Sequence, residues 1–352
     1  MKAVFITNIP APYQIKYCSV LKQYGDITYI FCNDKNSDRP EHWKIDLESN
    51  CIMLNPKKKY VIGNERYLNL DIWDQLNIIN PDIVIVGGFA APTNIISYNW
   101  ALKNKKKFVV FSEISRNPKN LKLYKVIYKK LDALMVCGKT AVKQFESVFE
   151  QKIYNYTYPA DLENKFRIKR SYNTQGIRFL YASRFVPEFN PLMCIKAFAE
   201  LRKKYNNISL LMSSNGELLD ESIKLVAQLK LKHCVEFRLK LEKWEDVNKL
   251  FEDSDILIYP ASFAGWGLVV PEAMAAGMPV ITTRAVGASD LLPDNQIIEC
   301  SEVALREKME EFIKDLSLVR SVGIDNREKA ESERFDRKAQ YFFECLNQIN
   351  DG

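Results

Sequence analysis

The chain has 352 residues, of which 47% are hydrophobic and 27% are charged, and its formal net charge is +6. This length exceeds what one hydrophobic core usually serves, so we expect a two-domain globular protein. The eight cysteines are scattered, with no CxxC pair and no cysteine–histidine cluster, and we interpret them as reduced core residues. No apolar run approaches the ~18 residues that a membrane-spanning helix needs.

Short apolar runs alternate with amphipathic segments in two series along the chain. The first series predicts strands at Ala3–Thr7, Asp26–Cys32, Ile83–Val86, Phe108–Phe111 and Ala133–Cys137. The second predicts strands at Ile177–Ala182, Ile208–Ser213, Val235–Phe237, Ile256–Tyr259 and Val280–Thr283. Strands that alternate with helices form parallel sheets covered on both faces, so the fold class is α/β.

A polar segment, Lys169–Gly176, separates the two series and marks a domain boundary. We predict an N-terminal Rossmann-like domain at residues 1–168, a C-terminal one at 169–334, and a last helix over Phe335–Ile349 within residues 335–352. Ligands bind at the carboxyl ends of the strands in open α/β sheets, so we expect two doubly wound domains that face a shared cleft.

The segment Tyr259–Thr283 combines a strand end, a glycine loop, a helix start and one acid, Glu272. Gly265 and Gly267 let the backbone approach a ligand closely, and a helix N-terminus suits a diphosphate. Glu272 then faces a hydroxyl pair of a sugar or ribose. The alternative is that the glycines only shape a tight turn and that Glu272 is an ordinary first-turn acid.

This segment resembles the donor-site signature of the family-4 retaining glycosyltransferases of the GT-B fold. The usual form is Glu-Gly-Phe-Gly-Leu, two or three residues, then Glu-Ala-Met-Ala-x-Gly-x-Pro-Val. The resemblance implies that Gly265, Trp266, Gly267, Leu268 and Glu272 bind a nucleotide-sugar, and that the last helix crosses back to the first domain.

The segment departs from the signature at Ala264, where the family has an acid near the donor sugar. Three outcomes stay open. Glu113 or another acid compensates, the donor lacks the hydroxyl that the missing acid would bind, or activity is lost.

The strand-loop-helix segment Phe179–Asn190 is similar to the one that begins the family's second domain, and Arg184 falls on the family's arginine. The resemblance implies that Arg184 neutralises the donor diphosphate as it leaves. Phe189 stands where the family has a second cation. The missing charge could be supplied by a nearby cation, with Arg238, Lys240, Lys243 and Arg284 as candidates. Arg238 and Leu239 also match the strand end that lines the base pocket in the family.

The first domain holds the acceptor in this fold, and its cleft loops are the candidates for acceptor contacts. Asn8, Pro12 and Tyr13 lie in the proline-stiffened loop after the first strand, and Gly88 opens another loop. Glu113 ends a buried strand where many relatives have a histidine at the reaction centre. We interpret Glu113 and Glu272 as the catalytic acids, and the alternative for Glu113 is an ion pair with Arg116.

No metal or other cofactor is expected, and the nucleotide-sugar is a substrate. Asp253-Ser-Asp255 has the spacing of the metal-binding Asp-x-Asp of another glycosyltransferase fold, but it precedes a strand as a helix end does. We therefore assign it to structure. The helix dipole, Arg184 and backbone N–H groups supply the positive field.

Lysines crowd the first domain at Lys57–Lys59, Lys103–Lys107 and between residues 117 and 131, where Leu121, Tyr124, Tyr128 and Leu131 share a helical face. One interpretation is peripheral docking to an anionic membrane that presents a lipid-linked saccharide. The other is a core-facing stripe with a solvated basic rim. No motif supports nucleic-acid binding, and we expect a cytoplasmic protein.

The sequence thus predicts a glycosyltransferase that moves a sugar from a nucleotide-sugar to a saccharide or lipid-linked glycan in bacterial surface glycan synthesis. We expect retention of configuration and no metal. Two alternatives remain: a non-catalytic sugar-nucleotide-binding or assembly protein, and a sugar-nucleotide epimerase or hydrolase on the same fold.

Overall fold

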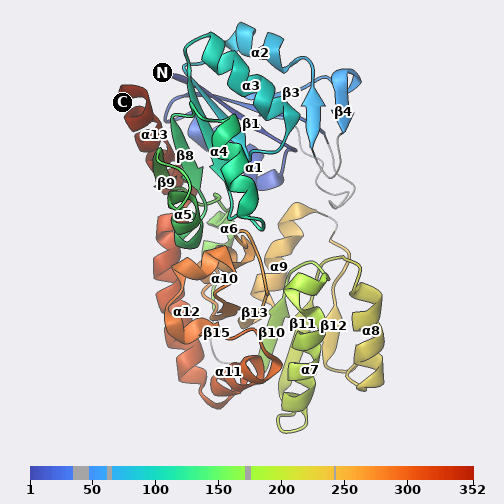
Figure 1. The fold of residues 1–352 in the computed structure, drawn as a ribbon. Helices are drawn as coiled ribbons and strands as arrows, with labels where there is room; N and C mark the ends of the chain where they lie inside the picture. Colours follow the sequence, from blue (N-terminus) through green and yellow to red (C-terminus); the bar gives the residue numbers. More distant parts are fainter. Residues whose placement is uncertain (35–46, 62–65, 171–175, 242) are drawn as a thin grey trace. The chain divides into compact units, whose positions relative to one another are not determined.

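The computed structural model describes residues 1–34, 47–61, 66–170, 176–241 and 243–352. The chain divides into two compact units, one formed by Met1–Pro159 with Phe335–Gly352 and the other by Ala160–Arg334 (Figure 1). The division falls after residue 159, whereas the sequence places the boundary after residue 168. The last helix, α13 (Phe335–Asp351), belongs to the first unit, and residues 171–175 of the polar segment lie outside the described residues.

In the described part of the first unit, parallel strands form one sheet in the order β3-β2-β1-β6-β7-β8-β9. The strands are β1 (Lys2–Thr7), β2 (Asp26–Phe31), β3 (Cys51–Met53), β6 (Ile83–Gly87), β7 (Lys107–Ser112), β8 (Ala133–Val136) and β9 (Lys152–Asn155). The five predicted strands are confirmed, each within one residue at its ends. β3 and β9 were not predicted, because they are short edge strands without a fully buried apolar run.

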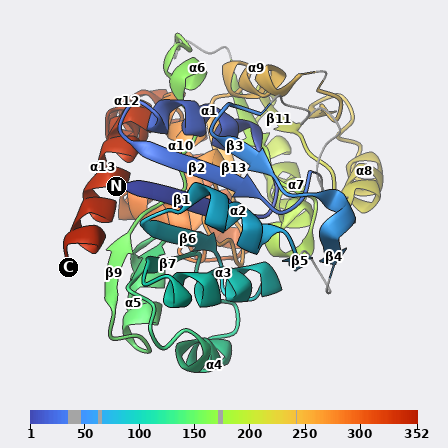
Figure 2. The same cartoon turned by 90° about the horizontal axis from the view of Figure 1, so that it is seen from above.

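Helices cover both faces of this sheet, with α1 on one side and α3 on the other (Figure 2). The helices between the strands are α1 (Pro12–Leu21), α2 (Ile72–Ile79), α3 (Pro92–Lys103), α4 (Lys119–Ile127) and α5 (Lys139–Glu146), with a 3-10 turn at Pro56–Lys58. A small antiparallel hairpin, β4 (Lys59–Val61) and β5 (Tyr67–Asn69), stands apart from the sheet. Proline at the first position of α1 and α3 suits a helix start because its missing N–H has no partner there anyway.

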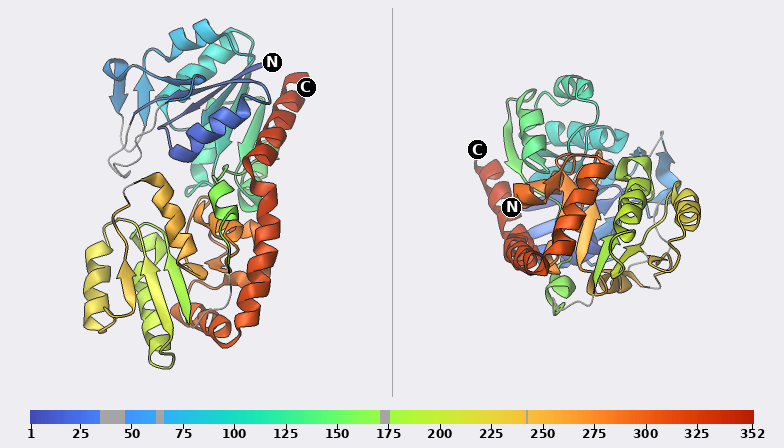
Figure 3. Two further views of the ribbon diagram at one scale, coloured as in Figure 1. Left: turned by 180° about the vertical axis from the view of Figure 1, so that it is seen from behind. Right: turned by 90° about the horizontal axis from the view of Figure 1, so that it is seen from below.

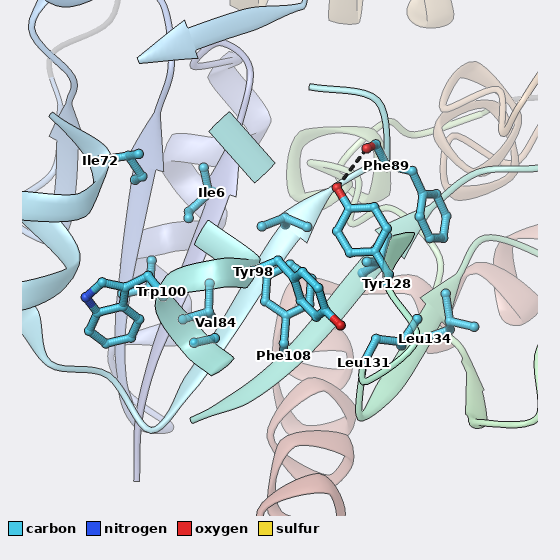
Figure 4. Packing of buried hydrophobic residues seen from close by; sticks show 14 of the residues in the cluster. Ile6, Ile72, Val84, Phe89, Tyr98, Trp100, Phe108, Tyr128, Leu131 and Leu134 are labelled. Carbon is cyan, nitrogen blue, oxygen red and sulfur yellow. Dashed lines mark hydrogen bonds between the residues drawn. The ribbon is translucent and has the colours of Figure 1, made fainter. Parts of the chain in front are cut away.

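One hydrophobic cluster of the first unit lies between its sheet and the helices α2 to α5. Side chains from β6 and β7 pack there against aromatic residues of α3 and the end of α4 (Figure 4). Tyr128 is fully buried, and its hydroxyl donates a hydrogen bond to the carbonyl oxygen of Phe89 at 2.8 Å. The buried hydroxyl thus keeps a partner, as a polar group in a core requires.

In the described part of the second unit, parallel strands pair in the order β12-β11-β10-β13-β14-β15. The strands are β10 (Ile177–Tyr181), β11 (Ile208–Met212), β12 (Val235–Phe237), β13 (Ile256–Tyr259), β14 (Val280–Thr283) and β15 (Ile297–Ile298). All five predicted strands are confirmed, and only the two-residue β15 was missed. A central strand such as β13 is buried on both faces and therefore reads as a continuous apolar run.

The helices of the second unit pack in two groups. They are α6 (Glu163–Phe166), α7 (Pro191–Arg202), α8 (Leu219–Gln228), α9 (Val247–Glu252), α10 (Val269–Ala275), α11 (Glu302–Lys314) and α12 (Leu316–Ala330), with shorter 3-10 turns at 187–189, 244–246, 287–291, 294–296 and 331–333. α7 packs against α8 and α11, whereas α10 packs against α6 and α12; the late helices are drawn in orange to red in Figure 3. Each unit is therefore a doubly wound α/β layer structure.

Candidate functional site

The second unit brings its predicted site residues to one edge of the sheet. β10 and β13 are neighbours at the point where the strand order reverses. Arg184 follows β10, and the loop with Gly265–Leu268 follows β13. Doubly wound sheets bind ligands at the carboxyl ends of strands at this switch point, so the topology favours the predicted donor site.

Hydrogen bonds fasten these two loops together. The backbone N–H of Ser262 donates to the carbonyl oxygen of Glu188 at 2.8 Å, and the side-chain amide of Asn190 donates to the carbonyl oxygen of Pro260, also at 2.8 Å. The loop after β13 is held on its other side, where Ala264 N–H donates to the carbonyl oxygen of Ala285 at 3.0 Å. Side chains on both loops therefore keep a defined mutual geometry.

The backbone at Gly267 requires glycine. Its φ is +97°, in the region that side chains disfavour, and an added Cβ would lie 3.0 Å from Tyr259 Cε1 and 3.0 Å from Val286 Cγ1. The preceding Trp266 is 3% exposed, and its indole N–H has no hydrogen-bond partner among the described residues. A buried donor without a partner is costly, so a small shift of this loop toward an acceptor would be favourable.

Glu272 lies in the first turn of α10 and pairs with Lys165 of α6. Its Oε1 is 3.1 Å from Lys165 Nζ, and the two side chains are 13% and 3% exposed. Glu272 is thus a first-turn acid, as the alternative interpretation has it, but it is mostly buried and paired, and its role as a donor contact stays a prediction. Sequence reasoning did not find Lys165, since the pair joins positions 107 residues apart and only packing of α6 on α10 reveals it.

Arg184 is exposed, and its guanidinium lies 5.7 Å from the centre of the Phe189 ring. Phe189 packs edge-on against Tyr259 with ring centres 5.5 Å apart. A cation over an aromatic face is attracted by the ring's negative π surface. Phe189 thus stands in place of the second cation of the resembled motif, and its ring contacts the first cation, Arg184.

The expected substitute cations differ in their surroundings. Arg238 pairs with Glu236 at 2.8 Å and with Asp253 at 2.6 Å, and these hydrogen bonds raise the pKa of Arg238. Arg284 pairs with Asp294. Both arginines have their charges balanced by acids, so Lys240 and Lys243, which are exposed, are the better remaining candidates. Leu239, the predicted base contact, is 40% exposed.

The helix dipole at the N-terminus of α10 is weaker than the sequence predicts, because α10 has only seven residues. A helix dipole is the sum of its aligned peptide units, so less than two full turns provide little field. The positive charge at this edge must then come chiefly from Arg184.

Ala264 is 6% exposed and forms a parallel bridge with Val286. Its backbone carbonyl accepts a hydrogen bond from Gly287 N–H at 3.2 Å. Position 264, where the resembled family carries an acid, is therefore a buried alanine in this protein.

In the first unit, the acceptor candidates follow three neighbouring strands. Asn8 follows β1, Gly88 follows β6 and Glu113 follows β7, and these strands lie side by side in the sheet. Gly88 has a φ of +79°, and its N–H donates to the carbonyl oxygen of Phe111 at 2.7 Å. The three residues thus lie at the carboxyl ends of adjacent strands, and their role as acceptor contacts stays a prediction.

Glu113 is half-buried next to the hydroxyl of Tyr158, which hydrogen-bonds to it. Burial is the main cause that raises the pKa of Tyr158, and the Glu113 carboxylate adds to it. Tyr13 lies near the same hydroxyl, and Pro12 is the buried first residue of α1. The structure thus gathers Tyr13 and Glu113 in one place, around a tyrosine that sequence reasoning did not select.

Asp253 and Asp255 both serve the protein's own structure. Asp253 follows α9 and pairs with Arg238, while a carboxylate oxygen of Asp255 accepts the backbone N–H of Arg178 at 2.8 Å. Burial raises the pKa of Asp255. Their assignment to structure agrees with these contacts, and the expectation that the reaction needs no metal stays a prediction.

The stripe on α4 faces the core. Leu121, Tyr128 and Leu131 are buried in the first unit's core, and Tyr124 packs against it. The interpretation of this stripe as a membrane-docking face is therefore wrong, and the alternative of a core-facing stripe with a solvated basic rim is confirmed.

Comparison with known proteins matches residues 163–329, just under half of the chain, to the family Glycosyl transferases group 1. The chain is 26% identical over 219 residues to an uncharacterized glycosyltransferase, YqgM, of Bacillus subtilis, which covers 60% of each protein. It is 27% identical over 164 residues to the capsular polysaccharide biosynthesis glycosyltransferase CapM of Staphylococcus aureus, covering 43% of this chain and 40% of CapM. The matches thus span 60% of the length of YqgM and 40% of that of CapM, less than two thirds of either relative.

Solved structures share the whole architecture at low identity. A glycosyltransferase of Rickettsia africae superposes with a TM-score of 0.77 at 15% identity, covering 99% of this chain and 98% of that one. Anabaena HepE, in complex with UDP and glucose, superposes with a TM-score of 0.72 at 16% identity and covers 99% of each chain. These matches show that the fold is GT-B, with two Rossmann-like units.

The matched family and both of these relatives are described as glycosyltransferases. The matched segment contains Arg184 and the whole Gly265–Glu272 loop, so the similarity coincides with the site built from the geometry. None of the helices within the described residues is long and apolar enough to span a bilayer.

Proposed function

We propose that this protein is a glycosyltransferase that moves a sugar from a nucleotide-sugar to a saccharide or lipid-linked glycan. The observation that carries the proposal is the placement of Arg184 and the Gly265–Glu272 loop on neighbouring strands at the switch point of a matched glycosyltransferase segment. This end of the sheet offers the exposed Arg184 on one loop and the mostly buried Glu272 in the helix after the other loop, which suits an anionic diphosphate beside a hydroxyl-rich sugar.

In the proposed reaction, negative charge develops next to a group of the site that can stabilise it. As the glycosidic bond breaks, negative charge grows on the leaving nucleoside diphosphate, and Arg184 on its Phe189 platform stabilises it. Glu272 accepts hydrogen bonds from donor hydroxyls. Glu113 of the first unit is proposed to contact the acceptor hydroxyl or the donor sugar, with transfer on the same face, so that configuration is retained without a metal.

The biological setting is proposed to be bacterial surface glycan synthesis. The similarity to the capsular polysaccharide biosynthesis protein CapM supports it. Buried Ala264 supports a second candidate, a sugar-nucleotide-binding protein without transferase activity, because the site lacks the acid that the resembled family keeps near the donor sugar.

A thermal-shift screen against nucleoside diphosphates and nucleotide-sugars in EDTA tests donor binding. A ligand at 100 times its Kd stabilises the folded state by about 2.7 kcal/mol, so the effective base appears as a raised Tm. Arg184→Ala should weaken that ligand about tenfold or more, whereas Arg320→Ala, an exposed arginine on α12, should not. A protein that responds to no nucleotide contradicts the proposal.

Transfer itself is tested with the donor so identified and a panel of saccharide and lipid-linked acceptors. We expect a product whose anomeric configuration, read by NMR, equals that of the donor, and equal rates with and without EDTA. Donor binding without any transfer would favour the non-catalytic candidate.

We further propose peripheral contact with an anionic membrane through the outer face of α4. Leu123 and Val126 are 58% and 70% exposed there, Lys119 and Lys122 are exposed on the same helix, and the exposed Lys129 lies two residues past its end. Apolar side chains ringed by lysines suit the boundary between anionic headgroups and acyl chains. This face lies opposite the buried stripe of the same helix.

Co-sedimentation with vesicles tests the membrane proposal. We expect binding to phosphatidylglycerol-containing vesicles but not to phosphatidylcholine alone, and a loss of several-fold in the double variant Leu123→Ser/Val126→Ser. Ile78→Ser on α2 is the control, since Ile78 is 75% exposed in the same unit without that ring of lysines. Equal loss in the control would refute this surface.

A further inference from the structure

The ion pair between Lys165 and Glu272 is the most buried one among the described residues. Lys165 Nζ lies 3.1 Å from Glu272 Oε1, with 3% of the lysine side chain exposed. A lysine is rarely buried without a partner, and here the partner is the acid that the proposed donor site requires. The pair therefore connects the start of the second unit to that site.

Lys165 is held in place from several sides. Its ammonium also donates to the carbonyl oxygen of Asp161 at 3.3 Å and lies 5.6 Å from the centre of the Phe251 ring. Arg327 donates hydrogen bonds to the carbonyl oxygens of the following residues, Phe166 and Ile168. The lysine has a fixed position, so it can fix the direction of whatever it binds.

The same segment is fastened to the elements around α10. Arg170 donates to the carbonyl oxygens of Ser254 and Phe251, each at 2.6 Å, and also to that of Ala276, just after α10. The α6 segment and the α10 helix thus form one rigid support, on which the lysine and the carboxylate face each other.

The contact of this pair at 3.1 Å is made by Oε1 of Glu272. Within the described residues, no hydrogen bond reaches the second oxygen, Oε2, while the side chain remains 13% exposed. A carboxylate held by one oxygen presents the other in a defined direction. That arrangement suits an acceptor for hydroxyl groups better than a closed structural pair.

We propose that Lys165 is a positioning residue that holds Glu272 so that Oε2 accepts hydrogen bonds from a hydroxyl pair of the nucleotide-sugar. The inference rests on the proposed donor site and adds a residue to it. The hydroxyl pair belongs either to the ribose or to the transferred sugar. Lys165 acts through Glu272 and does not touch the donor itself.

A purely structural ion pair predicts a different outcome. If the pair only ties α6 to α10, its loss lowers Tm and weakens every ligand by the same factor. If Lys165 positions Glu272, its loss weakens hydroxyl-bearing ligands selectively. The ratio of two affinities measured on one variant therefore separates the roles, because a general loss of stability cancels from it.

The experiment measures the Kd of UDP, ADP and GDP against their 2′,3′-dideoxy forms, and of each diphosphate against its nucleotide-sugars. The proteins are wild type, Lys165→Met, Lys165→Arg and Glu272→Gln, with Lys196→Met as a control at an exposed lysine of α7. We expect wild type and the control to prefer the hydroxyl-bearing ligand about tenfold in one of these two comparisons. That comparison identifies whether the hydroxyl pair belongs to the ribose or to the transferred sugar. Lys165→Met and Glu272→Gln should lose this preference, and Lys165→Arg should restore most of it.

A second substitution keeps the test sharp if Lys165→Met fails to fold. Lys165→Gln removes the charge but keeps a hydrogen-bonding amide in the buried position, and it should lose most of the preference that Lys165→Arg keeps. Three outcomes would overturn this inference but leave the proposed function standing. They are a preference that persists in Lys165→Met, a loss of affinity in Lys165→Met that is equal for all ligands, and a wild type without any preference. A wild type that binds no nucleotide at all would overturn the proposed function, and the inference with it.

Discussion

Replacing Gly267 by alanine perturbs the donor loop at the position where its backbone is most constrained. Alanine at a φ of +97° costs about 1–2 kcal/mol because its Cβ crowds the following carbonyl. The new Cβ would also lie 3.0 Å from Tyr259 and Val286, both buried, and such overpacking adds about 1–3 kcal/mol. We therefore expect Gly267→Ala to lower the free energy of unfolding by about 2–5 kcal/mol.

Thermal denaturation followed by circular dichroism measures this effect. In a unit of the size of Ala160–Arg334, each kcal/mol shifts Tm by about 2–4 °C, so the expected decrease is about 4–20 °C. Gly87→Ala is the matched control. The φ of Gly87 is not positive and its added Cβ would meet neighbours only at 3.5 Å or more, so Tm should stay the same or rise slightly.

Donor affinity should fall together with stability in Gly267→Ala, since the loop must shift to relieve the crowding. If Gly267→Ala melts with the wild type and binds the donor equally well, the loop does not hold the left-handed conformation, and the packing argument for this site fails.

Three further substitutions test neighbouring features. Phe189→Leu removes the ring beneath Arg184 and should weaken donor binding about two- to fivefold, as measured by calorimetry, since a cation–π contact at an exposed site contributes about 0.5–1 kcal/mol. Ala264→Glu buries a carboxylate and should lower Tm by several degrees more than the uncharged Ala264→Gln. Asp255→Asn should gain stability relative to wild type as pH rises from about 4, because burial raises the folded pKa of Asp255, so its contribution is present at low pH and lost above that pKa.

Each of these three expectations has an outcome that would contradict it. Unchanged donor affinity in Phe189→Leu would mean that the ring does not hold Arg184. Equal melting of Ala264→Glu and wild type would mean that position 264 opens toward the ligand after all. A Tm difference between Asp255→Asn and wild type that stays flat from pH 3 to 7 would mean that burial does not shift this carboxyl.

Local sequence was sufficient for the central strands and the donor loop. The bounds of β13 and β14 agree with the prediction at both ends, because a strand buried on both faces has no exposed side whatever it pairs with. The bounds of the edge strand β12 agree as well, although its middle residue is exposed. The φ of Gly267 is likewise a local demand that only glycine meets easily. The edge strands β3 and β9 lack a fully buried apolar run, so no local pattern marked them.

Only the tertiary structure decided which side chains meet. Lys165 and Glu272 are 107 residues apart, and neither position carries a local signal of the other; the pair follows from packing of α6 on α10. The lysines and apolar residues of α4 were visible in the sequence, but a helix has two faces, and burial of Leu121 against the sheet decided that Leu123 points outward. Local periodicity determines what an element is, whereas the strand order and the packing of its helices determine what each side chain touches.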